Sequence, residues 1–371
     1  MTQLNAVYHI DNFIDTFALG HYARVLLALD KRTQDEVAFK VLRPEHLLSD
    51  GDMRWEYRAF GNEALLLHAL KDSPNVVRLH DCGFVSTISE APDGGELVPF
   101  ATNAHAFNRA LYEYALKGWR PYLALEHLPR SNNLFYQMRG NQGKSWRLPS
   151  EEGLSLALQF AQVLQLAHHQ HIGYFDHKLE HVYWDGVQLR LIDFNSSKQL
   201  APSMTPQDMA KDLHHLCVGI LYPLFTGMSP QKGTLRPQPG GLETVDARYA
   251  DITELDFPPE AQLSQAIQDL LRRGAGMAYS SVSAFVEELQ RVAARHGRDF
   301  PTHASTPANR HARDMVRKGL KEVREGTSKL RSARDTLREA MLQDQLTPDM
   351  EDELRRLVKA INDMLHHRVI P

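Results

Sequence analysis

Two aspartates and one lysine in the middle of the chain have residue types that can carry out group transfer. Asp176 and Lys178 lie two residues apart, and Asp193 follows Asp176 by 17 residues within Ile192-Asp193-Phe194. A carboxylate can accept or orient a hydroxyl proton, and an ammonium group can stabilise negative charge that moves during a reaction. A second carboxylate supplies the oxygen ligands that a hard cation such as Mg²⁺ prefers. These three residues define the first candidate site.

A lysine and a glutamate far upstream form a second pair of complementary charge. Lys40 ends the β-like run Val37-Ala38-Phe39-Lys40, and Glu63 lies on the next segment with helical spacing, 11 residues before Pro74. A strand lysine that neutralises phosphate oxygens needs a carboxylate to hold it. Each residue alone is more simply an edge lysine with its charged end in water and a surface glutamate. Their order ahead of Asp176 favours a shared site.

The order of these motifs resembles that of the eukaryotic-type protein kinases, as a divergent bacterial-type Ser/Thr member. Tyr174–His181 (YFDHKLEH) aligns with the catalytic-loop pattern H-R-D-x-K-x-x-N, and Asp193-Phe194-Asn195 aligns with D-F-G. Val37–Lys40 matches V-A-I-K. Phe17–Val25 (FALGHYARV) keeps only the middle glycine of the phosphate-binding loop G-x-G-x-x-G-x-V.

The resemblance implies a role for each matched residue in binding ATP and transferring its terminal phosphoryl group. Asp176 would accept or orient the acceptor proton, and Lys178 would stabilise the γ-phosphate. Asp193 would bind Mg²⁺, with His181 at the position of the second metal ligand, and Asp212 would cap the catalytic-loop backbone. The residues implied in nucleotide binding, which include the hinge between the lobes, are Gly20, Val25, Ala38, Lys40, Glu63, Glu126 and Leu128.

Several positions around these charged residues depart from the family pattern. His181 stands where asparagine is usual, and imidazole suits softer ions than Mg²⁺, so Mn²⁺ is an alternative metal. Phe175 replaces the arginine that holds a phosphorylated activation loop, which argues against control by phosphorylation of that loop. Asn195 replaces a glycine, and only 16 residues separate it from Asp212, so we expect a reduced platform for protein substrates.

Three functions stay open on these residues. The first is an active kinase that transfers the γ-phosphoryl group of ATP to Ser/Thr hydroxyls of a protein. The second is a pseudokinase that binds nucleotide and acts as a scaffold, which His181 and the lost glycines favour. The third is a small-molecule phosphotransferase of the aminoglycoside-kinase type, favoured by the short segment after Asp193 and disfavoured by Lys178. Retention of five charged residues that are costly to bury favours the active kinase.

The apolar patterning places strands before helices, which predicts an α+β fold. β-like runs flank a polar turn at 30–33, Arg54–Leu70 has helical spacing, and Val76–Phe84 returns to strand. A long amphipathic helix is predicted over 151–171, and a buried helix over 208–225. We expect a two-lobed protein-kinase-like fold over roughly residues 9–298 with a C-terminal α-helical hairpin. The expected parts are an N-lobe with the hinge (1–128, with an insertion at about 86–120), a C-lobe (129–300), a linker (301–308) and a helical tail (309–371).

The tail differs from the rest in charge and periodicity. From Pro301 onward there are 14 basic and 11 acidic residues, whereas the first 300 residues carry 28 and 35. Eight positions from Val316 to Met341 alternate at spacings of four and three, and all are apolar except Thr327 and Arg334. Thr347-Pro348 begins a second helix. The tail is either a hairpin packed against the C-lobe or an element for dimerisation or partner docking.

Composition excludes several other classes of protein. The 371 residues carry 42 Lys+Arg and 46 Asp+Glu, a net charge of −4, which argues against binding of nucleic acid by charge alone. Two cysteines exclude a disulfide framework and a Cys-rich zinc module. The most apolar run, Leu216–Phe225, is far shorter than the ~20 residues that cross a bilayer. Without a signal-peptide pattern, the expectation is a soluble cytoplasmic protein.

Overall fold

The fold is taken from a computed structural model, in which the chain divides into two compact units, Met1–Pro301 and Thr302–Pro371. The structure describes residues 2–13, 22–47, 53–89, 92, 94–138, 147–200, 202–231, 245, 247–261, 263–295, 307–341 and 346–366.

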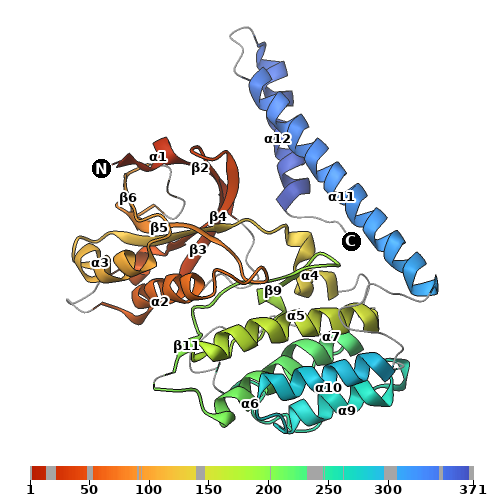
Figure 1. The fold of residues 1–371 in the computed structure, drawn as a ribbon. Coiled ribbons are helices and arrows are strands. Elements are labelled where there is room, and N and C mark those ends of the chain that lie inside the picture. The colour runs from red at the N-terminus through yellow and green to blue at the C-terminus, as the bar shows by residue number, and fades with distance from the viewer. Residues whose placement is uncertain are drawn as a thin grey trace. The chain divides into compact units, whose positions relative to one another are not determined.

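The first unit begins with a curled antiparallel sheet of seven strands in the order β1-β6-β5-β7-β4-β3-β2 (Figure 1). The predicted hairpin is confirmed as β3–β4, whose register pairs Asp30 with Asp35 across the turn. The strands are β1 (Thr2–Gln3), β2 (Tyr8–Phe13), β3 (Ala23–Asp30), β4 (Asp35–Leu42), β5 (Leu79–Val85), β6 (Glu96–Pro99) and β7 (Arg120–Glu126).

The predicted strand over Val76–Phe84 is wrong at its start, because β5 begins only at Leu79. Val76 instead forms a parallel bridge with Leu191 of the helical lobe, and the Val77 N–H donates to the Leu191 carbonyl at 2.9 Å. The backbone groups that a longer β5 would pair within the sheet are thus used to join the two lobes.

The two faces of the sheet carry different residues, since directly opposed positions in an antiparallel pair share a face. Val25 is opposite Lys40, and Ala38 is opposite Leu125, so these four lie on one face. The other face buries a separate apolar cluster that includes Phe39 and is covered by α1 (Leu4–Val7) and β2. Lys40 is therefore placed on the face that turns away from this second cluster.

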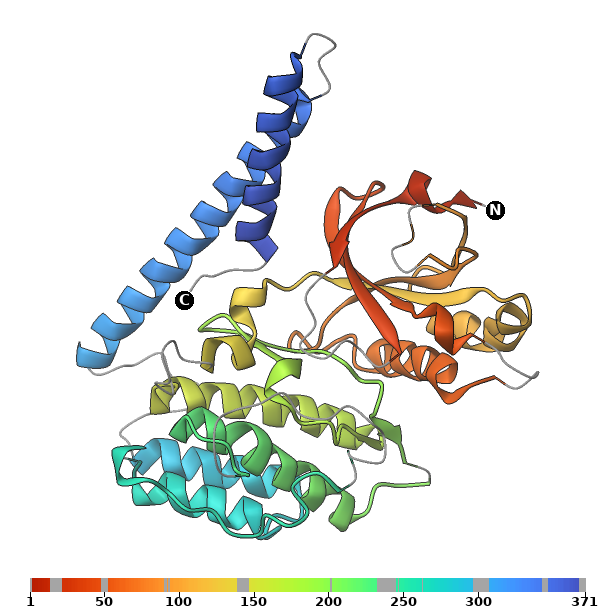
Figure 2. The ribbon, with the colours of Figure 1, turned by 180° about the vertical axis from the view of Figure 1, so that it is seen from behind.

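Two helices, α2 (Trp55–Ala69) and α3 (Ala104–Leu116), lie side by side against the sheet (Figures 1 and 2). The predicted helix over Arg54–Leu70 is confirmed as α2, which buries Phe60, Ala64 and Leu67 at helical spacing. Gly61 lets α3 approach closely, because a Cβ there would lie 2.4 Å from the Leu111 side chain. The same buried side of α2 carries Glu63.

The helical lobe follows β7 and contains two short strand pairs, β9–β10 and β8–β11 (Figure 1). The predicted helices over 151–171 and 208–225 are confirmed as α5 and as the continuous run α6–η5–α7, in which η5 is π-helical. The elements are α4 (Leu134–Met138), α5 (Ser150–His169), β8 (Ile172–Gly173), β9 (Val182–Trp184), β10 (Leu189–Leu191), β11 (Lys198–Gln199), α6 (Pro206–His215), η5 (Leu216–Leu221), α7 (Tyr222–Thr226), α9 (Gln265–Ala275) and α10 (Val282–Arg295).

The second unit is a helical hairpin of α11 (Pro307–Ala340) and α12 (Pro348–His366), which pack against each other (Figure 2). The predicted pair of helices in the tail is confirmed. Taken with the first unit, this gives the mixed α+β fold with a C-terminal helical hairpin that the sequence predicts. Within the described part of the chain, no helix combines the length and apolar character needed to cross a membrane.

Candidate active site

The loop that carries Asp176 is fixed from below by Asp212 of α6. The Asp212 carboxylate accepts hydrogen bonds from the N–H groups of Tyr174 (2.9 Å) and Phe175 (2.7 Å), and it contacts His168 Nε2 at 2.9 Å. Burial would raise the pKa of Asp212, but these donors hold it below its usual value. The predicted cap is confirmed, and it holds Phe175 at a φ of 55°, in the left-handed region.

Lys40 joins two carboxylates that come from different lobes. Its Nζ donates to Glu63 Oε2 at 2.7 Å and to Asp193 Oδ1 at 2.9 Å. Burial opposes a charged Lys40, yet Asp193 and Glu63 together hold its pKa well above the usual value. Burial raises the pKa of Glu63, and Lys40 counteracts that rise. The structure thus brings together three residues that are 23 and 153 positions apart in the chain.

His181 connects the two aspartates. Its Nε2 lies 3.2 Å from Asp193 Oδ2, and its Nδ1 lies 3.2 Å from the backbone carbonyl of Asp176. Asp193 has a φ of 63°, a left-handed conformation that Lys40 and His181 hold from opposite oxygens. Burial would raise the pKa of Asp193, but Lys40 and His181 lower it far below its usual value. Asp193 is therefore a carboxylate in all ordinary conditions.

Two basic side chains contact Asp176. Lys178 Nζ lies 3.4 Å from Asp176 Oδ1, and the guanidinium of Arg248 also donates to this oxygen. Burial would raise the pKa of Asp176, but His181, Lys178 and Arg248 lower it. Sequence reasoning missed Arg248 because it belongs to no motif and to no periodic segment.

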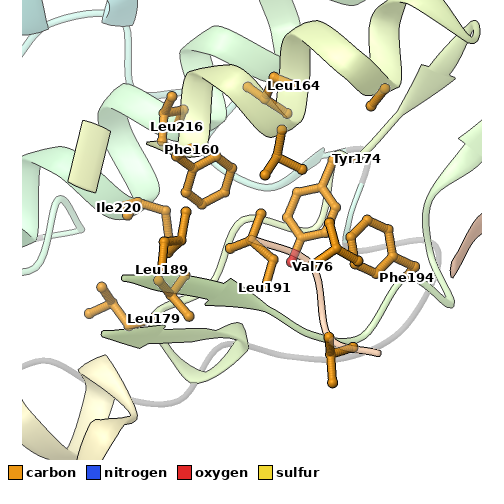
Figure 3. Close-up of a cluster of buried hydrophobic side chains, with 14 of the residues drawn as sticks. Val76, Phe160, Leu164, Tyr174, Leu179, Leu189, Leu191, Phe194, Leu216 and Ile220 are labelled. Carbon is orange, nitrogen blue, oxygen red and sulfur yellow. The ribbon is translucent and has the colours of Figure 1, made fainter. Parts of the chain in front are cut away.

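An apolar column supports the loop that carries Asp176 from the core side. Tyr174 packs against Phe194 with ring centroids 5.1 Å apart and against Phe160 at 5.9 Å, and Figure 3 shows Leu191 beside them. Leu67 of α2 belongs to the same buried cluster. Tyr174 and Phe194 meet edge to face, with an interplanar angle of 62°, so the aromatic ring at the position of the motif's histidine is part of the buried core.

The residues predicted to bind nucleotide lie on the sheet face of Lys40 and at the end of β7. Val25 and Ala38 share that face, as described above, and Glu126 closes the strand with its N–H donating to the Arg78 carbonyl at 2.9 Å. Leu128 follows β7 and packs against the core cluster. Gly20 lies outside the described residues.

Asp193 and His181 fit a divalent cation as a pair of ligands, not as a complete cage. Across the described residues, no group of three or more His, Cys, Asp or Glu side chains could hold a metal. Asp193 Oδ2 and His181 Nε2 are 3.2 Å apart. A carboxylate oxygen and an imidazole nitrogen are both donors that a divalent cation accepts. The remaining ligands would come from nucleotide oxygens and water.

Comparison with known proteins gives a distant structural similarity. No protein-family model matches the sequence. Among solved structures, the chain is similar to the autoinhibited serine kinase domain of the giant muscle protein titin, with a TM-score of 0.49 and 14% identity, over 77% of this chain and 80% of that chain. We therefore argue function from the contacts of this chain's own residues.

Proposed function

We propose that this protein is a cytoplasmic ATP-dependent kinase that transfers the γ-phosphoryl group to a Ser/Thr hydroxyl of a protein, without control by activation-loop phosphorylation. The observation that carries the proposal is the Lys40 ammonium held between Glu63 and Asp193, within the same unit as the Asp176–Lys178 pair. A scaffold without nucleotide has no use for so many charges in one buried place, because each is costly to desolvate.

Each residue of the set has a task in this proposal. Glu63 orients Lys40 toward the phosphates, and Asp193 with His181 would hold the divalent cation, Mg²⁺ or Mn²⁺, that neutralises them. Asp176 orients the acceptor hydroxyl and accepts its proton, while Lys178 steadies the transferred group. Phe175 supports the absence of phosphorylation control, since its buried ring packs onto Gly173 and offers no charge to a phosphate.

A second candidate is a nucleotide-binding scaffold without catalytic activity. It is favoured by one observation: both oxygens of Asp193 are already engaged, one by Lys40 and one by His181. A cation must compete with these partners for the carboxylate. In this reading the site binds nucleotide, and no phosphoryl transfer follows.

Incubation of the full chain with γ-labelled ATP and Mg²⁺ or Mn²⁺ tests the proposal. We expect label to appear on the protein itself or on a generic protein substrate, and we expect Asp176→Asn to abolish it. Asp269→Asn is the matched control, because Asp269 is an exposed carboxylate that contacts Arg272 and Gln265 on the surface of α9. Equal labelling by wild type and Asp176→Asn would contradict the kinase. Nucleotide binding without transfer would support the scaffold, and transfer to a small alcohol alone would support a small-molecule phosphotransferase.

A further inference from the structure

The Asp176 carboxylate is covered by Arg248, which follows the buried helical run α6–η5–α7 in the sequence. Arg248 and Lys178 both meet Oδ1 of Asp176, and the Asp176 and Arg248 side chains are only 2% and 3% exposed. An acceptor hydroxyl must come within hydrogen-bond distance of this carboxylate to lose its proton. In the arrangement seen here it has no access. An acceptor therefore reaches Asp176 only if the Arg248 side chain moves.

The backbone that carries Arg248 is firmly anchored. The Tyr249 hydroxyl donates to the carbonyl of His177 at 3.2 Å, and the Tyr249 carbonyl is 3.0 Å from His214 Nε2. The Tyr249 ring packs directly on η5, since a Cβ at Gly219 would lie 2.5 Å from it. Opening of the site thus requires rotation of the Arg248 side chain over a fixed turn.

The segment after Asp193 follows another course. The Ser197 hydroxyl donates to the Tyr174 carbonyl at 3.0 Å, and the Leu200 N–H donates to the His171 carbonyl at 2.7 Å. The chain then enters α6 at Pro206. Among the described residues, the turn around Arg248, which follows α6 and α7 in the sequence, thus contacts Asp176.

The charge of Arg248 limits how it can leave Asp176. Moving the Arg248 guanidinium away from the Asp176 carboxylate gives up a buried pair of opposite charges, and a second anion that binds the guanidinium would offset this loss. Carboxylates and phosphates match the planar fork of a guanidinium and form charge-assisted hydrogen bonds with it. A neutral acceptor offers no such exchange.

We propose that Arg248 selects the acceptor: the hydroxyl that receives the phosphoryl group lies beside an anionic group, a carboxylate or a phosphate, which takes Arg248 from Asp176. This inference rests on the proposed function and names the chemistry of its substrate. Arg248 acts on specificity, and Asp176 keeps its role toward the hydroxyl.

A set of acceptor peptides tests this selection. One serine is flanked by alanine, by glutamate or by phosphoserine, and transfer is measured for wild type, Arg248→Met and Arg248→Lys. We expect wild type to prefer the anionic peptides at least tenfold in kcat/KM, with the two anionic peptides showing whether carboxylate or phosphate is favoured. Arg248→Met should use the alanine peptide with the same kcat/KM as the two anionic peptides. Arg248→Lys should keep part of the preference for the anionic peptides. An unchanged preference in Arg248→Met, or loss of transfer to all three peptides, would overturn the proposal.

Chemical labelling of carboxylates gives a readout that does not depend on transfer. Carbodiimide coupling of an amine, followed by mass spectrometry, should leave Asp176 unmodified in wild type and modify it in Arg248→Met. Arg273→Met is the control, because Arg273 pairs with Glu288 on the surface of the helical lobe. The glutamate or phosphoserine peptide should increase labelling of Asp176 in wild type, and the alanine peptide should not. If a non-hydrolysable ATP analogue, added without any peptide, increases amine labelling of Asp176, the nucleotide phosphate moves Arg248. That result would overturn selection by the acceptor. If wild type transfers nothing but these labelling results hold, the kinase proposal fails and the exchange of Arg248 stands.

Discussion

His181 changes the metal-binding side of the site more than any other single residue. Its Nε2 contacts Asp193 Oδ2 at 3.2 Å, and its Nδ1 lies 3.2 Å from the Asp176 carbonyl. When a cation binds Asp193, a proton kept on Nδ1 by that carbonyl would leave Nε2 free to act as a nitrogen ligand. Nitrogen ligands raise affinity for Mn²⁺ relative to Mg²⁺. The residue that departs from the family motif therefore predicts a measurable preference.

We expect Mn²⁺ to support binding of an ATP analogue better than Mg²⁺ does. The increase in melting temperature with analogue plus metal should be larger for Mn²⁺ in wild type, and His181→Asn should reduce that difference by removing the nitrogen ligand. His169→Asn, at an exposed position near the end of α5, should leave the difference unchanged. Equal stabilisation by both metals in wild type would disprove the nitrogen ligand.

Lys40 has a second consequence, for stability. Loss of one member of a buried ion pair leaves its partner charged and desolvated, which costs about 3 kcal/mol. Lys40→Met leaves Glu63 in this state, because Glu63 is fully buried. We expect Lys40→Met to lower the free energy of unfolding by about 3 kcal/mol, and Lys40→Met/Glu63→Leu to recover most of it. Urea denaturation measures both values.

The control for this pair is Arg273→Met, which removes a surface ion pair with Glu288 and should cost less than about 1 kcal/mol. If the double variant is less stable than Lys40→Met, the ion pair is not the source of the loss.

The individual residues of the site were predictable where a motif carried them. Lys40, Glu63 and Asp193 were named from short local patterns, and the structure brings them into contact. Arg248 could not be named in this way. Its position beside Asp176 depends on a turn held by Tyr249, and contacts of that kind between distant segments leave no local pattern.

At the scale of elements, the catalytic loop rests on a group of buried histidines. His177 stacks on Phe160 with centroids 5.2 Å apart, and His215 Nδ1 is 2.8 Å from the Phe175 carbonyl. Burial lowers the pKa of His177 to about 3 and that of His215 to about 4. These rings link α5, α6 and the loop in their neutral form, which makes this junction sensitive to acid.

We expect the stability of the first unit to fall as the pH drops below about 6.5. In the unfolded chain both histidines take up a proton near pH 6.5, whereas the folded protein does not until about pH 4 or 3. The unfolded state therefore binds more protons in this interval, and the effect is absent above pH 6.5. At pH 5 the loss is about 2 kcal/mol for each histidine. Melting temperatures between pH 7.5 and 5 measure it.

His177→Phe should reduce this acid sensitivity. Among the described residues neither ring nitrogen of His177 has a hydrogen-bond partner, so phenylalanine keeps the stacking and loses no bond. Stability at pH 7.5 should be equal or higher. An identical pH dependence in wild type and His177→Phe would assign the acid effect to other groups.

Helices and strands were predictable where the apolar spacing was regular and their bounds did not depend on backbone pairing with a distant segment. The helices α2 and α5 lie within a residue or two of their predicted bounds, because their apolar spacing is regular. The start of β5 was misplaced by three residues, since Val76 and Val77 pair with Leu191 and not within the sheet. Backbone pairing between the lobes depends on tertiary structure, and the hydrophobic pattern of one segment does not predict it.

At the scale of the whole molecule, every described contact of the candidate site lies within Met1–Pro301. We expect a chain ending at Pro301 to unfold cooperatively and to keep its response to nucleotide.

The hairpin α11–α12 exposes Met315, Met350, Leu357 and Met364. Such side chains favour association, so we expect removal of the tail to lower the molecular mass in solution to that of a monomer. Light scattering and labelled ATP test the two parts separately, and loss of transfer with an intact fold would assign the tail a role in catalysis.

We expect the backbone bridge between Val76 and Leu191, in the segment that joins α2 to β5, to act as a pivot between the lobes. Lys40 and Glu63 both lie on the sheet side of this pivot, whereas Asp193 lies two residues beyond Leu191 on the other side. Rotation of the lobes about it stretches the Lys40–Asp193 contact and leaves the Lys40–Glu63 contact intact. The distance from Lys40 Nζ to Asp193 thus reports how far the lobes have opened, and the distance from Lys40 Nζ to Glu63 serves as the unchanged reference.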